Sequence, residues 1–161
     1  MATANNDPAF RYFPSDYRWS MGWLLALNAS HHGGAQIDEA NRVGLALKDK
    51  IGNDDAWYAE WVRMGDKVER KGREAEKAGH KLTAAAYLMR ACNYYQAGER
   101  FLQPKSAAGN AVYAKSVKCF ADAARMISRP RIESVEIPYK GQSLPALLVH
   151  ADPAVAGSKP A

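Results

Sequence analysis

The sequence contains few cysteines. Its two, Cys92 and Cys119, form neither a C-x-x-C pair nor a cysteine–histidine spacing typical of a metal site. Both fall within apolar helical patterns, where a free thiol packs as a small hydrophobic side chain. The pattern therefore predicts no metal and no other cofactor, and it is typical of a reduced, cytoplasmic protein.

Long apolar runs and secretion signals are also missing. The first seven residues have no basic region followed by an apolar stretch, which argues against a signal peptide. The most apolar run, Met21–Leu27, is far shorter than the roughly 20 residues that a membrane-spanning helix requires. We therefore expect no membrane partner.

The charge is not strongly biased toward one sign, with a formal net charge of +5 in 161 residues. The densest basic stretch, Lys67–Arg73, includes Glu69 and is bordered by Asp66 and Glu74. Such mixing is typical of a solvated helix face rather than of a phosphate-backbone contact. We therefore expect no nucleic-acid partner.

Apolar residues at helical spacing, in a chain that is 47% hydrophobic, predict a mainly α domain of about five helices. The first four are predicted over 15–30, 36–50, 55–78 and 83–102, and the fifth follows Ser106 and ends before Pro130. Ser15 and Ser106 are candidate N-caps, the 52–54 segment is expected to end the second helix and cap the third, and Thr83 opens the fourth helix. The fifth helix is expected to bury Tyr113, Val117, Phe120, Ala124 and Ile127.

Two glycines interrupt the third predicted helix. Gly65 and Gly72 are seven residues apart and therefore lie on roughly one helix face. A glycine inside a helix costs about 1 kcal/mol relative to alanine. The pair therefore predicts that another helix, or a bulky aromatic side chain, approaches the backbone closely at this face.

After Pro130 the periodicity changes to that of strands. Val135, Ile137 and Tyr139 alternate with other residues, and 143–150 forms a second, more apolar strand beyond a turn. An isolated hairpin is marginally stable in water, and the second strand is apolar on both faces. We therefore expect a helical domain over 1–130, and over 131–161 the first two strands of an incomplete sheet.

Two blocks of the sequence resemble a known family. Arg90–Leu102, R-A-C-N-Y-Y-Q-A-G-E-R-F-L, is similar to an R-A-x-N-Y-Y-R-x-A-E-F-F-L helix, and Val135–Ala146 is similar to a V-x-I-P-Y-E-G-x-x-L-P-G hairpin. Both belong to the α/β-hydrolases that include 2,6-dihydroxypseudooxynicotine hydrolase and the fungal heptaketide-shortening pigment hydrolase. The chain departs from this pattern at Gln96, Arg100 and Ala146.

The resemblance implies a helical N-terminal cap followed by the opening hairpin of a truncated α/β-hydrolase domain. Such enzymes cleave a carbon–carbon bond next to a ketone, or an ester-type bond, with a Ser-His-Asp triad whose serine lies in G-x-S-x-G. This chain contains no G-x-S-x-G. We therefore expect this chain to contain no catalytic residue and to be inactive alone. The resemblance implies that the complete enzyme binds a small carbonyl or ester substrate. It also allows a homodimer.

Three polar residues of the fourth helix are the candidate site. Arg90, Asn93 and Tyr94 lie beside its apolar stripe, where a cap could present them to a substrate. The alternative is that they form hydrogen bonds between helices of the cap. The H-H-G-G stretch at 31–34 resembles an esterase oxyanion motif, but its position at the end of a helix favours a helix-terminating turn.

A second interpretation comes from another class of protein. Antiparallel helices rich in alanine, glycine and tyrosine would suit a stand-alone binding module of the tetratricopeptide kind. No convincing 34-residue repeat is found, and a terminal hairpin has no place in such an array. The hydrolase interpretation is therefore preferred.

Overall fold

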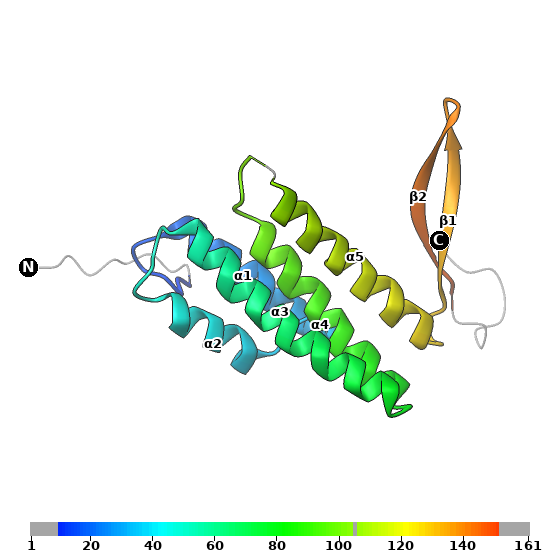
Figure 1. Cartoon of the computed structure of the whole chain (residues 1–161), viewed down its shortest axis with the longest axis horizontal. Coiled ribbons are helices and arrows are strands. Elements are labelled where there is room, and N and C mark those ends of the chain that lie inside the picture. Colours follow the sequence, from blue (N-terminus) through cyan, green and yellow to red (C-terminus); the bar gives the residue numbers. More distant parts are fainter. Residues whose placement is uncertain (1–9, 105, 152–161) are drawn as a thin grey trace, which may run out of the picture.

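The computed structural model describes residues 10–104 and 106–151, and it is mainly helical, as predicted (Figure 1). The described elements, in chain order, are α1 (Tyr17–Asn28), a short 3₁₀ helix η1 (Ala29–His32), α2 (Ile37–Leu47), α3 (Asp54–Lys77), α4 (Lys81–Glu99), α5 (Ala107–Met126), β1 (Ile132–Tyr139) and β2 (Gln142–Val149). None of the described helices combines the length and the apolar character needed to cross a membrane.

Side-chain caps fix where several helices begin. The side chains of Asn53 and Ser106 accept hydrogen bonds from backbone N–H groups in the first turns of α3 and α5, as predicted. The prediction that Ser15 caps α1 is wrong, because the side chain of Asp16 accepts the hydrogen bond from the N–H of Trp19. The start of α4 was also placed late, since the helix begins at Lys81, before Thr83.

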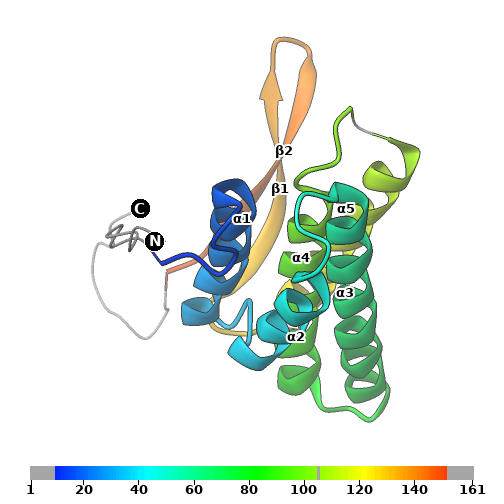
Figure 2. The same cartoon turned by 90° about the vertical axis from the view of Figure 1, so that its left-hand side faces the viewer.

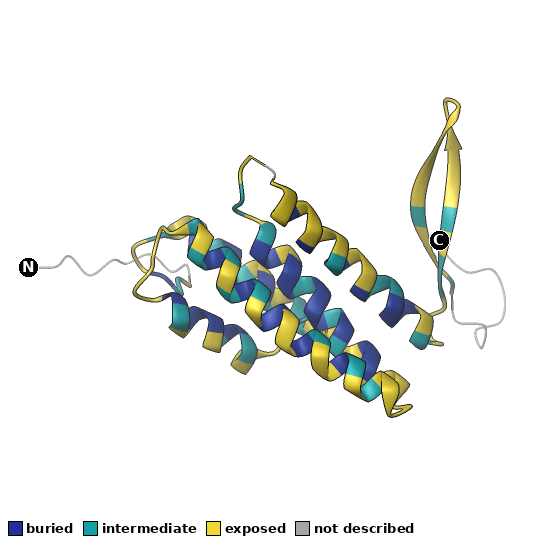
Figure 3. Cartoon of the chain, in the orientation of Figure 1, coloured by how far each residue is buried: buried dark blue, intermediate teal, exposed yellow. Residues whose placement is uncertain are grey.

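The three longest helices form the centre of the molecule. α4 packs against both α3 and α5, while α1 and α2 lie on another side of this layer (Figure 2). The inward-facing surfaces are buried along each helix (Figure 3). The largest fully buried side chains are aromatic, and they include Trp19, Trp57, Trp61, Tyr94 and Tyr95. Their large apolar area makes this aromatic core the main source of stability.

At the two glycines of α3, side chains of α4 lie close to the α3 backbone, which confirms the prediction. A Cβ on Gly65 would lie 2.6 Å from a ring carbon of Tyr95, which is too close for any side chain. A Cβ on Gly72 would lie 3.1 Å from the side chain of Leu88. The absence of side chains at these positions therefore lets the aromatic and aliphatic residues of α4 rest on the α3 backbone.

The predicted inner face of α5 is wrong. Tyr113 and Val117 are 54% and 49% exposed, and of the predicted stripe only Ala124 is buried. The buried side lies mainly one position earlier in the helix, and it includes Val112, Ser116, Cys119 and Ala123. These are smaller side chains, so α5 can approach α4 more closely through them than through its tyrosine and phenylalanine.

The hairpin pairs β1 with β2 in an antiparallel register, with Val135 opposite Ala146 and Ile137 opposite Leu144. Lys140 and Gly141 form the turn, and both have positive φ angles, 46° and 76°. Two such residues are typical of a tight two-residue hairpin turn. The hairpin projects away from the helices (Figure 1).

The apolar side chains of the hairpin remain exposed on both faces. Leu147 and Leu148, which are neighbours in β2 and therefore point to opposite faces, are 52% and 47% exposed. Every described hairpin residue is at least partly exposed. The helices therefore do not cover this hairpin. Residues 152–161, the remainder of the predicted second domain, lie outside the described part.

Candidate functional site

Two of the three predicted site residues form a buried polar cluster with α2. The hydroxyl of Tyr94 donates a hydrogen bond of 2.7 Å to a carboxylate oxygen of Glu39, and Nε of Arg90 donates to the same oxygen at 3.0 Å. The Tyr94 hydroxyl also accepts a hydrogen bond from the backbone N–H of Gln36. Tyr94 is fully buried and Arg90 nearly so. The cluster therefore fixes the first turn of α2 against α4.

The third residue, Asn93, binds a different segment. Its side-chain amide donates hydrogen bonds of 2.9 Å to the backbone carbonyls of Ala26 and Gly34. These carbonyls lie near the end of α1 and in the loop before α2. The structure thus brings Arg90, Asn93 and Tyr94 together on the side of α4 that meets α1 and α2. Each makes hydrogen bonds between helices, and their contact with a substrate stays a prediction.

The protonation state of Tyr94 follows from its surroundings. Burial raises the pKa of its hydroxyl, and the hydrogen bond to Glu39 raises it further. The phenol therefore remains neutral at physiological pH and acts as a hydrogen-bond donor to the carboxylate. Arg90 additionally stacks over the ring of Tyr87, with its guanidinium carbon 4.5 Å from the ring centroid.

Glu39 is the member of this cluster that the sequence did not predict. It lies 51 positions from Arg90 in the chain, so no local spacing connects the two residues. The sequence of α4 does indicate that such a partner exists, because an arginine and a tyrosine four residues apart on a buried face require a hydrogen-bond acceptor. The sequence does not identify which acidic residue provides it.

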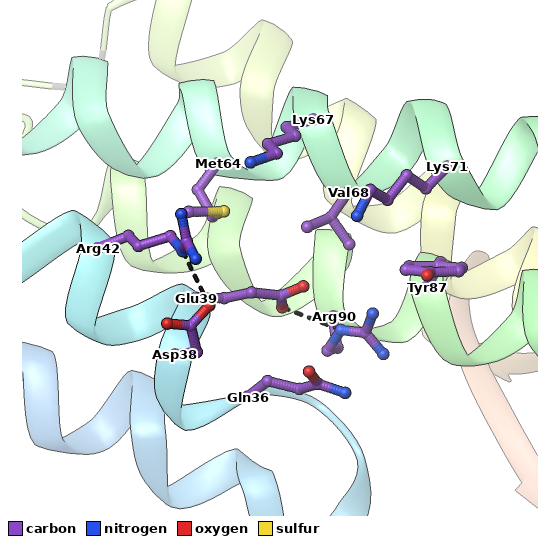
Figure 4. A pocket seen from close by; sticks show the side chains of 10 residues that line it. All are labelled: Gln36, Asp38, Glu39, Arg42, Met64, Lys67, Val68, Lys71, Tyr87 and Arg90. Carbon is purple, nitrogen blue, oxygen red and sulfur yellow. Dashed lines mark hydrogen bonds and ion pairs between the residues drawn. The ribbon is translucent and has the colours of Figure 1, made fainter.

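A cavity of about 280 Å³ lies beside this cluster, between α2, α3 and α4 (Figure 4). Arg90 and Glu39 form one part of its wall, and Lys67 and Lys71 of α3 form another. Met64 and Val68, both buried, provide apolar surface between them. The site residues of α4 therefore adjoin a polar, mostly cationic hollow.

A second, more apolar groove of about 510 Å³ separates α5 and α4 from the hairpin. Tyr113, Val117 and Phe120 of α5 line it opposite Val135 and Leu147. This groove explains the exposed side of α5, because its larger apolar residues face the hairpin rather than α4. The volume lies within the range typical of small-molecule sites, about 300–1,000 Å³.

The described residues form no cluster suited to a metal ion, and the thiol that lines the apolar groove is not activated. Nowhere in 10–104 and 106–151 do three or more histidine, cysteine or acidic side chains gather in a way that could hold a metal ion. Burial raises the pKa of Cys92, which lines the apolar groove, to about 11. Its thiol therefore stays protonated and unreactive at neutral pH.

The H-H-G-G stretch forms a helix-terminating turn, as predicted. His31 and His32 belong to the 3₁₀ helix that follows α1. Gly33 ends it with a φ of 75°, and its N–H donates to the carbonyls of Ala29 and Ser30. The left-handed conformation requires glycine or a similarly tolerant residue. The glycines here thus shape a turn.

The chain is similar to α/β-hydrolases. Three curated relatives are alpha/beta hydrolase ucsC from Acremonium sp, hydrolase acrC from Aspergillus aculeatus and 20-hydroxy-prefusarin hydrolase FUS2 from Gibberella moniliformis. They are 26%, 30% and 29% identical over 83%, 81% and 86% of this chain. No protein-family profile matches the sequence.

These relatives confirm the resemblance seen in the two sequence blocks, since all three are named as hydrolases. The chain spans 28%, 30% and 33% of the lengths of these three proteins. The similarity to this chain therefore covers about a third of the length of each relative.

Proposed function

We propose that this chain forms the helical cap, over 1–130, and the opening hairpin, within 131–161, of an α/β-hydrolase. The enzyme would cleave a carbon–carbon bond next to a ketone, or an ester-type bond, in a small carbonyl compound. The observation that carries the proposal is the exposed hairpin, whose two apolar faces require further strands, in a chain similar to proteins named α/β-hydrolases.

In the proposed enzyme, a Ser-His-Asp triad outside these residues performs the chemistry. Serine attacks the carbonyl carbon, histidine takes the serine proton and later protonates the leaving group, and backbone N–H groups stabilise the oxyanion. The helical cap excludes water and shapes the pocket. Arg90, Asn93 and the fully buried Tyr94 would act on substrate binding indirectly, because their hydrogen bonds hold α1 and α2 against α4 and so set the shape of the cap.

The first test is to read the parental gene beyond Ala161. We expect the reading frame to continue through further strands to a G-x-S-x-G within roughly a hundred residues. The full-length protein should hydrolyse an activated ester or a β-diketone, and a Ser→Ala change in that motif should abolish turnover.

The 161-residue chain is the matched control for the same assay. We expect it to show no turnover above the buffer rate. A reading frame that stops at Ala161 and yields a well-folded soluble protein would contradict the proposal and favour a helical binding module. Turnover by the short chain that a single Ser→Ala change abolishes would also contradict it.

A further inference from the structure

The cavity between α2, α3 and α4 carries an excess of positive charge. Four basic and two acidic side chains line it, which leaves a formal charge of +2 (four minus two). The basic residues are Arg42, Lys67, Lys71 and Arg90, and the acidic residues are Asp38 and Glu39. The lining comes from α2, its N-cap residue Gln36, α3 and α4, so the charge of the cavity does not depend on the proposed hydrolase function.

The two carboxylates already have cationic partners. Asp38 accepts a hydrogen bond of 2.8 Å from Nε of Arg42, and Glu39 accepts one of 3.0 Å from Nε of Arg90. The excess charge therefore resides on Lys67 and Lys71. Within the described part of the chain, neither lysine makes an ion pair or a hydrogen bond. The ammonium group of Lys71 lies 5.9 Å from the centroid of the Tyr87 ring, in a cation–π contact.

The arginines of α3 behave differently from these lysines. Arg63, Arg70 and Arg73 each form an ion pair with at least one carboxylate. Lys67 and Lys71 are four residues apart on one face of the same helix, where two like charges repel each other. An anion placed between them would remove this repulsion and stabilise the folded protein.

Arg90 adds a third, rigid donor. Its side chain is only 9% exposed, and its Nε and Nη1 groups donate to Glu39 and to the carbonyl of Ala86. Among the described contacts, Nη2 has no acceptor. Figure 4 shows Lys67 and Lys71 extending from α3 and Arg90 from α4 around the same hollow. Lys67 and Lys71 are themselves exposed, and the buried Met64 and Val68 provide the apolar surface between them.

We propose that this cavity binds a phosphate group. A phosphate carries a charge of about −1.5 to −2 at neutral pH, and its acceptor oxygens point in several directions. It can therefore meet the two lysine ammonium groups and the free N–H groups of Arg90 together and balance the charge of +2. A planar carboxylate, with one negative charge, would leave half of that charge uncompensated.

The test is calorimetric titration of the 161-residue chain with inorganic phosphate, pyrophosphate and glycerol phosphate, at constant ionic strength set with KCl. We expect saturable binding of at least one of these anions. Lys67→Gln and Lys71→Gln should each weaken it about tenfold, the effect of losing one charge-assisted hydrogen bond. Glutamine keeps most of the side-chain stem, so circular dichroism should confirm an unchanged fold.

Lys77→Gln is the matched control, because Lys77 is an exposed residue of the same helix that does not line the cavity. It should bind as the parent chain does. Tighter binding of glycerol phosphate than of inorganic phosphate would assign the site to a phosphate ester, and the reverse order to free phosphate. The absence of saturable binding, or an equal loss in Lys77→Gln, would overturn the proposal.

Discussion

At the scale of single residues, the buried tryptophans differ in how their indole N–H groups are satisfied. Nε1 of Trp57 donates a hydrogen bond of 2.7 Å to the carbonyl of Ala97, near the end of α4. Nε1 of Trp61 is buried and has no hydrogen-bond partner in the described part of the chain. Because both side chains are fully buried, the pair separates the effect of the hydrogen bond from that of packing.

We predict that Trp57→Phe destabilises the protein more than Trp61→Phe. Both changes remove a similar buried volume, but only the first deprives a carbonyl of its donor, which costs about 1–3 kcal/mol. The free energies of unfolding, measured with urea, should therefore differ by roughly that amount. Equal losses for the two variants would show that the Trp57 hydrogen bond contributes nothing to stability.

At the scale of the helices, several ion pairs join α3 and α5, and one of them involves a buried carboxylate. Asp122 of α5 is 5% exposed and binds Arg73 of α3 at 2.7 Å and Lys118 of its own helix at 2.8 Å. Burial acts to raise the pKa of this carboxyl, but the hydrogen bonds from Lys118 and Arg73 outweigh it and hold the pKa below its ordinary value. Its ionised form therefore stabilises the folded state.

This coupling predicts a pH-dependent loss of stability. Because the pKa of Asp122 is lower in the folded state, the unfolded state binds the proton first as the pH falls. The stabilisation is complete above the unfolded pKa of about 3.9 and is lost as the pH drops toward the folded value. Asp122→Asn should thus be less stable at pH 7 by about 1–3 kcal/mol, and the difference should shrink below about pH 4.

Unfolding by urea at several pH values measures this difference. Glu74→Gln is the control, because Glu74 is an exposed acid of α3 whose closest ion pair is 3.9 Å long. It should change stability little at any pH. A constant difference between the parent chain and Asp122→Asn from pH 7 to pH 3 would contradict the proposed role of the carboxylate.

The contact between α3 and α4 gives a second prediction at this scale. Gly65→Ala would place a methyl group 2.6 Å from the Tyr95 ring, and such overpacking costs about 1–3 kcal/mol. A methyl group at Gly72 would lie 3.1 Å or more from its nearest neighbours, in Leu88 and Tyr87, so a shift of a few tenths of an ångström accommodates it. The gain in helix propensity of up to about 1 kcal/mol should offset most of that cost. Thermal unfolding should therefore rank Gly65→Ala well below Gly72→Ala; the reverse order would contradict the close contact.

The same helices show how far sequence reasoning reaches. Apolar spacing located all five helices, and the positions of Gly65 and Gly72 predicted the close approach of α4. The inner face of α5 could not be predicted, because apolar residues occupy two adjacent sides of that helix. Packing against α4 selects the side with smaller residues, such as Ser116 and Cys119, and spacing carries no information about that choice.

For the candidate site, too, the sequence predicted which residues share a helix side but not their partners. Position on α4 correctly grouped Arg90, Asn93 and Tyr94 on one side of the helix. Their partners, Glu39 and the carbonyls of Ala26 and Gly34, are 51 to 67 positions away in the chain. Contacts over such distances depend on how the helices pack together. The spacing of charges along a single helix also gave no sign that Lys67 and Lys71 border a cavity shared with α2 and α4.

At the scale of the whole molecule, the helices and the hairpin differ in how they are stabilised. Every buried hydrophobic residue in the described part lies before Ile127, from Phe13 to Ala124. The hairpin adds only partly exposed contacts, mainly with α5. The proposed boundary at residue 130 therefore separates a segment with an aromatic core from one whose described residues, 131–151, form no core.

This division predicts that residues 1–130 fold without the hairpin. Removal of 131–161 exposes part of α5 but takes no buried side chain from the core, so the melting temperature should fall by only a few degrees, equivalent to about 1 kcal/mol. Circular dichroism should retain the helical signal. The shortened chain should also associate less, because the exposed apolar strands offer edges that pair with other molecules.

Size-exclusion chromatography over a range of concentrations measures that association. Leu144→Thr with Leu148→Thr, in the full 161-residue chain, is the matched variant, since it keeps strand propensity while reducing apolar surface at two positions that are each 47% exposed. It should reduce association without lowering the melting temperature. Loss of the helical fold on removal of 131–161 would show that the strands stabilise the helices, and the hairpin would then belong to the same folding unit rather than to a separate sheet.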